Sequence, residues 1–392
     1  MRCFLVVSAL GLARAPVAAF AALGAFWGCF ASYVPAVKAG LGVSDGAFGL
    51  LLLGSACGLV SAMWVAPRVD RALGRRALPV AACLLAAAWT LPTLVPLPAL
   101  FFASLALVGL CSGLLDVTMN SRVSELEALH GRSLMNGAHG MFSVGYAVSA
   151  IVAGFEREAG LPAFAALMIV ALVVVVLLVP RMTQEPHRVE APSHGRGRYP
   201  LWPILLCGGV VLSAFMTEAA VESWSALHIE RTLGGRAAEG ALGPFMLGLT
   251  MAVGRFGGQV VAERLREVTV VVIAGSVAAL GALVAAWASS PLMAYAGFGL
   301  FGLGVSVIGP MGLALVGRMV PPHFRTEAIS RAAVMGFSGF FFAPVLMGLV
   351  SQAFGPAWGL RAAFTLVAVL VAASIPLALV LSRRPTGEAQ PA

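Results

Sequence analysis

The sequence predicts an all-α integral membrane protein with 12 transmembrane helices in two pseudo-symmetric six-helix bundles. Of its 392 residues, 60% are hydrophobic and only 11% are charged, a composition outside the usual range of water-soluble domains. Apolar runs of about 20 residues, the length at which an α-helix crosses a bilayer, recur along the chain. One long polar stretch separates these runs into two groups of six.

The expected spans are helices, because a helix pairs its backbone groups within itself. The first six are predicted at residues 14–37, 44–66, 77–96, 98–121, 133–156 and 161–181. The second six are predicted at residues 201–226, 241–263, 268–288, 291–317, 327–351 and 358–381. Glycines from Gly297 onward allow close helix approach, and Pro310 is expected to kink its helix.

The polar stretch from Thr183 to Pro200 is rich in Pro, Gly, His and Arg and lacks apolar periodicity. Such a segment is typical of a linker. The predicted domains are an N-terminal six-helix bundle (1–182), a cytoplasmic linker (183–200) and a C-terminal six-helix bundle with a short cytoplasmic tail (201–392). Two parallel repeats of this kind are expected of a rocking secondary transporter with its site at the repeat interface.

The positive charges predict the orientation, because Lys and Arg accumulate in cytoplasmic loops. With both termini in the cytoplasm, 20 of the 25 Lys and Arg residues fall on the inner side. The remaining five are expected outside: Lys38, Arg157, Arg231, Arg236 and Arg361. This topology also explains the net charge of +8, so no nucleic-acid partner is expected.

Other classes of function lack a sequence signal. The six Cys residues form no CxxC pair, so neither a disulfide framework nor a metal site is expected. The chain has no Walker pattern and no GxGxxG after a strand, so ATP-driven transport has no support. No Ser, His and Asp set indicates an enzyme. We expect no cofactor, with a proton gradient as the energy source, and a monomer in the lipid bilayer.

The loop "APRVDRALGRR" after the second span resembles the loop signature of the major facilitator superfamily. It departs from that signature by Ala66 in place of a leading Gly and by one extra residue between Arg71 and Gly74. The resemblance implies the fold of that superfamily. It also implies that Asp70, Arg71 and Arg75 belong to a cytoplasmic latch between helices, together with Arg255 of "GRFGGQ" at the corresponding place in the second half.

Four further segments resemble the bacterial YbjJ-type branch, which is related to the fucose–proton symporter (FHS) family. They are "GLGVSDGAFGLLLLGSACG", "GLLDVTMNSRVSELE", "MNGAHGMFSVG" and "TEAAVESWSALHI". The resemblance covers nearly the whole chain and implies a multi-pass protein of the bacterial inner membrane. It does not imply one substrate, because one fold serves many solutes.

Asp116 is the first candidate for proton coupling, because a charged residue inside a membrane helix is costly and usually paired or functional. The FHS resemblance associates a carboxylate at this position with coupling, followed four residues later by an Asn, here Asn120. Asn120, on the same helix face, is a candidate for solute binding. A carboxylate in a partly dry cavity binds and releases a proton as water access changes. The alternative is a structural charge that pairs with Arg122 or Arg132. His139, at a similar depth, could relay a proton with Asp116 or could be a structural residue.

The seventh span carries Glu218 and Glu222, four residues apart and therefore on one helix face. Glu218 is a second candidate for proton coupling or solute contact, and Glu222 is either a solute contact or a hydrated residue at the rim. Trp27 and Tyr33 of the first span could stack on a solute or bond to it, although an interfacial aromatic belt explains Tyr33 equally well.

Together these features predict proton-coupled secondary transport of a small polar solute, sugar-like or another metabolite, by alternating access. Two alternatives stay open. The same acids suit a proton-antiport exporter of metabolites or drugs. A non-transporting sensor or scaffold would not need the titratable groups Asp116, Glu218 and Glu222.

Overall fold

The computed structural model describes residues 11–186, 201–262, 265–321 and 324–382. Within these ranges all regular elements are helical. The first part of the chain forms α2 (Arg14–Leu41), α3 (Asp45–Leu73), η1 (Gly74–Arg76), α4 (Ala77–Trp89), α5 (Pro98–His130), α6 (Met135–Glu158), α7 (Ala163–Val173), η2 (Val174–Leu178) and η3 (Val179–Arg181). The second part forms α8 (Trp202–Leu233), α9 (Ala237–Ala262), α10 (Glu267–Ala286), α11 (Pro291–Met319), α12 (Arg325–Phe337), α13 (Gly339–Ala372) and α14 (Ser374–Ser382).

Ten helical stretches of the described chain are long and apolar enough to cross a membrane. Two of them, Asp45–Trp89 and Glu327–Ser382, are 45 and 56 residues long, about twice the length that one crossing needs. Each contains a glycine with positive φ, Gly74 (53°) and Gly355 (73°), where the helix is interrupted. The all-helical architecture is confirmed, and the number of twelve crossings stays a prediction compatible with these lengths.

Several helices extend beyond the predicted apolar spans. α5 continues to His130 and α8 to Leu233, because charged residues at the end of an apolar run are still good helix formers. Both helices stop at a glycine in the left-handed region, Gly131 (φ 62°) and Gly234 (φ 70°), the conformation that commonly ends a helix. The extension of α8 adds Glu230 and Arg231 to the helix that carries Glu218.

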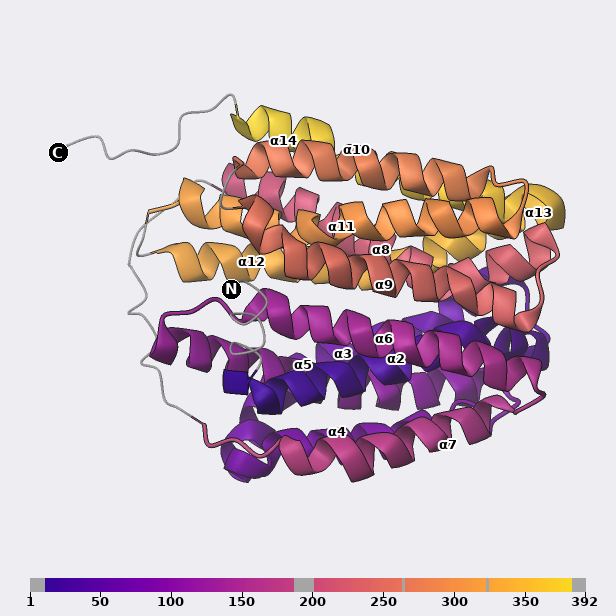
Figure 1. Ribbon diagram of the computed structural model, residues 1–392, viewed down its shortest axis with the longest axis horizontal. Helices are drawn as coiled ribbons and strands as arrows, with labels where there is room; N and C mark the ends of the chain where they lie inside the picture. The colour runs from indigo at the N-terminus through magenta and orange to yellow at the C-terminus, as the bar shows by residue number, and fades with distance from the viewer. Residues whose placement is uncertain (1–10, 187–200, 263–264, 322–323, 383–392) are drawn as a thin grey trace.

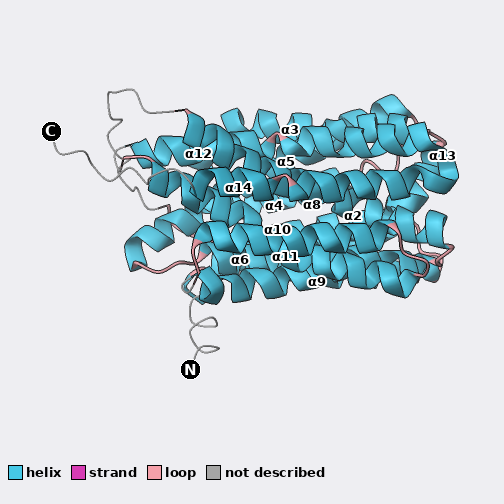
Figure 2. Cartoon of the chain, turned by 90° about the horizontal axis from the view of Figure 1, so that it is seen from above, coloured by secondary structure: helices cyan, strands magenta, loops and turns pink. Residues whose placement is uncertain are grey.

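The helices lie side by side along the long axis of the molecule (Figures 1 and 2). The two parts of the chain occupy opposite sides of this axis (Figure 1). The two sides meet where α6 packs on α9, α3 on α13, and α2 on α8. The predicted domain boundary at residue 182 falls between η3 and α8, and residues 187–200 of the predicted linker lie outside the described residues.

We call the end of the bundle where α2 begins and α14 ends the termini end, and the opposite end the distal end. Small residues bring the helices close together between these ends. Gly28 of α2 lies so close to α6 that a Cβ on Gly28 would overlap the Tyr146 backbone. A Cβ on Gly109 of α5 would likewise overlap the Ser55 backbone of α3. Close backbone approach at small residues is a general way for membrane helices to pack.

Candidate functional site

The interior of the bundle contains an ion pair between α8 and α9. Arg255 Nη2 donates to Glu218 Oε1 at 2.9 Å, and the two side chains are only 11% and 12% exposed. Arg255 Nη1 also donates across to the first half of the chain, to Ser143 Oγ of α6 at 2.5 Å and to the carbonyl oxygen of His139 at 3.4 Å. One guanidinium therefore joins three helices and both halves.

The sequence allows this contact because α6 and α9 approach each other at glycines. A Cβ on Gly140 of α6 would overlap the ring of Phe256, which follows Arg255. A Cβ on Gly248 of α9 would overlap the ring of Tyr146. Without these side chains the two helices come close enough for Arg255 to span the gap.

Two more polar groups lie near this ion pair. Glu222 is one helical turn beyond Glu218 on the same face of α8. The Tyr146 side chain is 1% exposed, and its hydroxyl has no hydrogen-bond partner among the described residues although both carboxylates act on it electrostatically. We call Ser143, Tyr146, Glu218, Glu222 and Arg255 the central cluster.

Asp116 lies apart from the central cluster. It is partly buried on α5, on the helix face that also carries Gly109 and Gly113, which pack against α3. Asn120 Nδ2 donates to Asp116 Oδ1 at 3.1 Å and to the Asp116 carbonyl oxygen at 2.9 Å. No cation among the described residues pairs with Asp116, so the alternative of a pair with Arg122 or Arg132 is not supported.

Arg122 binds other carboxylates instead. Its Nη2 lies 2.5 Å from Asp70 Oδ1 and its Nη1 2.9 Å from Glu125 Oε1, with the Arg122 side chain 1% exposed. Asp70 thus ties α3 to α5, and its role in a cytoplasmic latch stays a prediction. Arg71 donates to Pro67 within its own helix, and the exposed Arg75 reaches Glu185 at 3.8 Å.

The contacts of Arg255 do not support the latch role expected for it. The resemblance placed it at the inner end of its helix, whereas its partners are Glu218, Ser143 and the His139 carbonyl in the bundle interior. The cause is that Arg255 lies seven residues before the last residue of α9, Ala262, which is about 10 Å along a helix.

His139 does not share a hydrogen bond with Asp116 in the part of the chain that the structure describes. Its ring lies against Phe20, with ring centroids 4.7 Å apart, and its carbonyl faces Arg255. The structure therefore brings His139 next to the central cluster through its backbone, and the proton relay with Asp116 stays a prediction without a supporting contact.

Trp27 and Tyr33 are also separate from the central cluster. The Trp27 ring packs edge-on against Trp89, with centroids 5.0 Å apart, so it faces α4 within the first half. The Tyr33 hydroxyl donates to the Leu161 carbonyl at 2.9 Å, at the distal end. Both side chains already have packing or hydrogen-bond partners, which supports structural roles for them.

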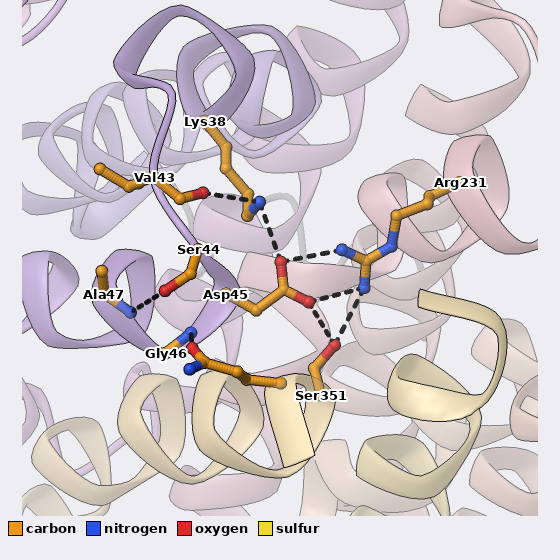
Figure 3. Close-up of polar contacts among 9 residues, drawn as sticks. Lys38, Val43, Ser44, Asp45, Gly46, Ala47, Arg231 and Ser351 are labelled. Atoms are coloured by element: carbon orange, nitrogen blue, oxygen red, sulfur yellow. Dashed lines mark hydrogen bonds and ion pairs between the residues drawn. The ribbon is translucent and has the colours of Figure 1, made fainter. Parts of the chain in front are cut away.

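The distal end holds a second polar group that bridges the halves (Figure 3). Asp45 at the start of α3 receives both Arg231 nitrogens of α8 at 2.8 Å. Its other partners are Lys38 at 2.9 Å and the Ser351 hydroxyl of α13 at 2.5 Å. We call Lys38, Asp45, Arg231 and Ser351 the distal network.

Two further ion pairs join the halves at the same end. Arg157 of α6 pairs with Glu230 of α8, and Arg236 lies 3.3 Å from Glu158. Four of the five basic residues expected outside the membrane are therefore partners of carboxylates in these contacts.

Sequence reasoning missed Ser143, Tyr146 and Ser351, because Ser and Tyr are common in membrane helices and carry no charge signal. It missed Asp45 as well, because an acidic residue directly after Ser44 is typical of a helix N-terminus. The basic residues at the distal end were the available signal, because Lys and Arg are expected to be rare on that side.

Comparisons with known proteins agree with this architecture. The family model described as "Major Facilitator Superfamily" matches residues 17–266 and 206–392. An uncharacterized MFS-type transporter of Yersinia pestis is 27% identical over 343 residues, which cover 85% of this chain and 87% of the relative. The membrane protein MosC of Rhizobium meliloti is 27% identical over 332 residues, with coverage of 83% and 80%.

Solved structures show the same fold. A bacterial homolog of the human lysosomal transporter Spinster, in an inward-facing and occupied conformation, gives a TM-score of 0.74 at 15% identity and covers 97% of both chains. A D-xylose–proton symporter gives a TM-score of 0.71 at 16% identity, with coverage of 93% of this chain and 96% of the other.

Proposed function

The chain belongs to the Major Facilitator Superfamily, a family of transporters rather than enzymes, and we propose that it moves a small polar solute across a membrane in exchange for, or together with, protons. Transport proceeds by alternating access between the two halves. The finer resemblance to the YbjJ-type and FHS branch is part of this proposal and favours uptake.

One observation carries the proposal. Arg255 binds Glu218 of its own half and Ser143 of the other half at the same time. If the halves rock against each other, the bond to Ser143 breaks while the bond to Glu218 persists. The charge state of Glu218 therefore decides how strongly Arg255 binds a partner in the other half.

Protonation of Glu218 would remove the counter-charge of Arg255. A buried guanidinium without a partner is costly, so the protonated state favours a conformation in which Arg255 reaches water or a solute. This is the physical link between a proton and a change of conformation, and it makes Glu218 the first coupling residue of the proposal.

Asp116 is the second coupling residue. Its only described side-chain partner is the amide of Asn120, which stabilises the carboxylate without neutralising it. A carboxylate in that position can take up a proton when the water path to it changes. We assign no coupling step to His139, whose ring packs on Phe20.

We further propose that the protein is a monomer of the bacterial inner membrane with both termini in the cytoplasm, which makes the distal end the outer end. No cofactor is required, because the proton gradient supplies the energy. The aromatic residues Trp27 and Tyr33 take no part in solute binding in this scheme, whereas Asn120 acts through Asp116 and Glu222 contacts the solute.

The test is solute-driven proton flux in liposomes that enclose a pH dye. Wild-type protein is compared with Glu218→Gln, Asp116→Asn and the matched control Glu267→Gln, whose ion pair with Arg318 joins α10 to α11 within one half. We expect flux in the wild type and the control and a loss of at least tenfold in the other two variants. Proton flux that persists in both variants would refute the coupling scheme.

The direction of coupling is decided in the same vesicles. Acidification of the side that receives the solute indicates symport, and alkalinisation indicates an antiporter. Solute uptake with no proton movement in the wild type would reduce the proposal to a uniporter.

A further inference from the structure

Glu222 lacks a partner in the central cluster. It makes no hydrogen bond and no ion pair with any residue that the structure describes, because Arg255 is already bonded to Glu218 and Ser143. The cluster contains two carboxylates and one guanidinium, which leaves one negative charge uncompensated when both acids are ionised. Glu222 itself is only partly buried, and its charge is open to compensation by a cation that comes from outside the protein.

Two buried hydroxyl groups near Glu222 also lack partners. The Tyr146 side chain is 1% exposed and Ser225 is fully buried, yet neither hydroxyl has a hydrogen-bond partner among the described residues. Tyr146 comes from α6 and lies within electrostatic range of Glu222 and Glu218. Ser225 follows Glu222 by three residues on the same side of α8, facing Gly243 of α9.

Unsatisfied buried hydroxyls cost free energy and are uncommon in folded proteins. Here two of them, from opposite halves of the chain, accompany an unpaired carboxylate. Each offers oxygen lone pairs that can accept a hydrogen bond. The three groups together offer hydrogen-bond acceptors from α6 and α8 and one negative charge.

We propose that Glu222, Tyr146 and Ser225 form the subsite for a protonated amine of the transported solute, an inference that rests on the transporter function proposed above. A primary ammonium has three N–H donors and no acceptor. It can donate one to the Glu222 carboxylate and one to each hydroxyl oxygen, and its charge neutralises the cluster.

Other solute groups fit this subsite less well. An uncharged hydroxyl can donate a single hydrogen bond and leaves the Glu222 charge without compensation. An anionic group is repelled by Glu222 and Glu218. A second positive charge on a short solute would approach Arg255, so a monoamine is favoured over a diamine.

The test measures binding without transport. The midpoint of thermal unfolding of the purified protein is recorded with three pairs of solutes that differ in an amine: glucosamine and glucose, ethanolamine and ethylene glycol, tyramine and 4-hydroxyphenethyl alcohol. A ligand that binds only the folded state raises the midpoint in a concentration-dependent way. We expect at least one amine to raise it and its uncharged partner to leave it unchanged at equal concentration.

Variants identify the subsite. Glu222→Gln should weaken the binding of that amine at least tenfold, Tyr146→Phe several-fold, and Glu267→Gln not at all. Tyr146→Phe removes one hydroxyl with little change of shape, so it keeps the test valid if Glu222→Gln folds poorly. Equal binding of the uncharged partner, no binding by any of the three amines, or unchanged binding in Glu222→Gln and Tyr146→Phe would overturn the proposal.

Liposome flux separates this inference from the transporter function. Amine binding that depends on Glu222, with no flux of that amine, would refute transport of the amine and leave the subsite intact. Flux of a neutral solute in wild-type protein that no amine stabilises would refute the subsite and leave the transporter function intact.

Discussion

Removing the carboxylate of Asp45 is expected to open the distal end of the bundle. Asp45 is 9% exposed and is the common partner of Lys38, Arg231 and Ser351. In Asp45→Asn the bidentate pair with Arg231 is lost. Lys38 and Arg231, which bind the same Asp45 oxygen, then face each other as like charges without the anion between them.

The size of the effect follows from the burial of the partners. Removing one member of a buried ion pair costs about 3–5 kcal/mol, whereas exposed pairs contribute about 0–1 kcal/mol. Because Arg231 is 26% exposed, we expect an intermediate value of about 2–3 kcal/mol, lost only from the conformation with a closed distal end. Such a difference shifts the ratio of closed to open molecules roughly 30- to 150-fold.

Arg231→Gln provides a graded comparison. It breaks the same contact between the halves but leaves Asp45 paired with Lys38 at 2.9 Å within the first half. No like-charge repulsion is created, so the opening should be smaller than in Asp45→Asn. The order Asp45→Asn, then Arg231→Gln, then wild type is specific to the arrangement of charges in Figure 3.

The assay is a distance distribution between spin labels at the exposed positions Ala39 and Ala353, one in each half at the distal end, in a background without native cysteines. We expect a longer distance component to become dominant in Asp45→Asn. Glu267→Gln is the control, since its pair with Arg318 stays within the second half. An unchanged distribution in Asp45→Asn, or a larger change in Arg231→Gln, would refute the reasoning.

Three other predictions test the packing and the central cluster through the midpoint of thermal unfolding. Arg255→Gln alone should lower the stability by about 3–5 kcal/mol, because it leaves a buried Glu218 unpaired. The double variant Glu218→Gln/Arg255→Gln should recover part of that loss. A double variant less stable than Arg255→Gln would contradict this reasoning about the ion pair. Gly28→Ala should lower the stability sharply, because its Cβ would overlap the Tyr146 backbone. Gly257→Ala meets no atom within 4 Å and should gain up to about 1 kcal/mol of stability from helix propensity. Equal changes of the unfolding midpoint in the two variants would contradict the packing. Tyr33→Phe should cost about 1 kcal/mol for the lost bond to Leu161 without changing solute flux, and a loss of flux would return Tyr33 to the binding site.

The helical architecture could be predicted from the sequence because hydrophobicity and length alone decide which segments can lie in a bilayer. The twelve predicted runs overlap helical segments of the structure. Where the ends differ, as in α5 and α8, the helix continues into charged residues that a hydropathy criterion excludes. Gly131 and Gly234 were the signals for the true ends, since both adopt positive φ.

The site was predictable only for residues whose chemistry is costly in a membrane. Glu218 and Glu222 were selected from sequence because charge stands out in an apolar helix, and both lie in the central cluster. Arg255 was assigned to a latch because its motif resembles a loop signature, and only the packing of α9 on α6 shows that it bridges the halves. Tyr146 and Ser225 carry no charge, and their importance follows from the absence of a described partner, which no sequence pattern reports.

The central cluster and the ion pairs at the distal end are connected by the same two helices, α6 and α8. α8 carries Glu218 and Glu222 near its middle and Glu230 and Arg231 near its distal end. Arg231 lies 13 residues after Glu218, which is about 20 Å along a continuous helix. α6 likewise carries Ser143 and Tyr146 in its interior and Arg157 and Glu158 at its distal end.

Because a helix is rigid, a tilt of α6 or α8 at the central cluster also moves the distal end of that helix. The Arg255 contact to Ser143 and the pair between Arg157 and Glu230 therefore cannot both persist when the two halves separate at the distal end, because α6 and α8 are the helices that separate. A proton or an ammonium group that weakens or replaces the central contact removes one of the restraints on that motion. The distal network then sets the remaining cost, so Asp45→Asn should raise the rate of exchange even of a solute that never touches Asp45.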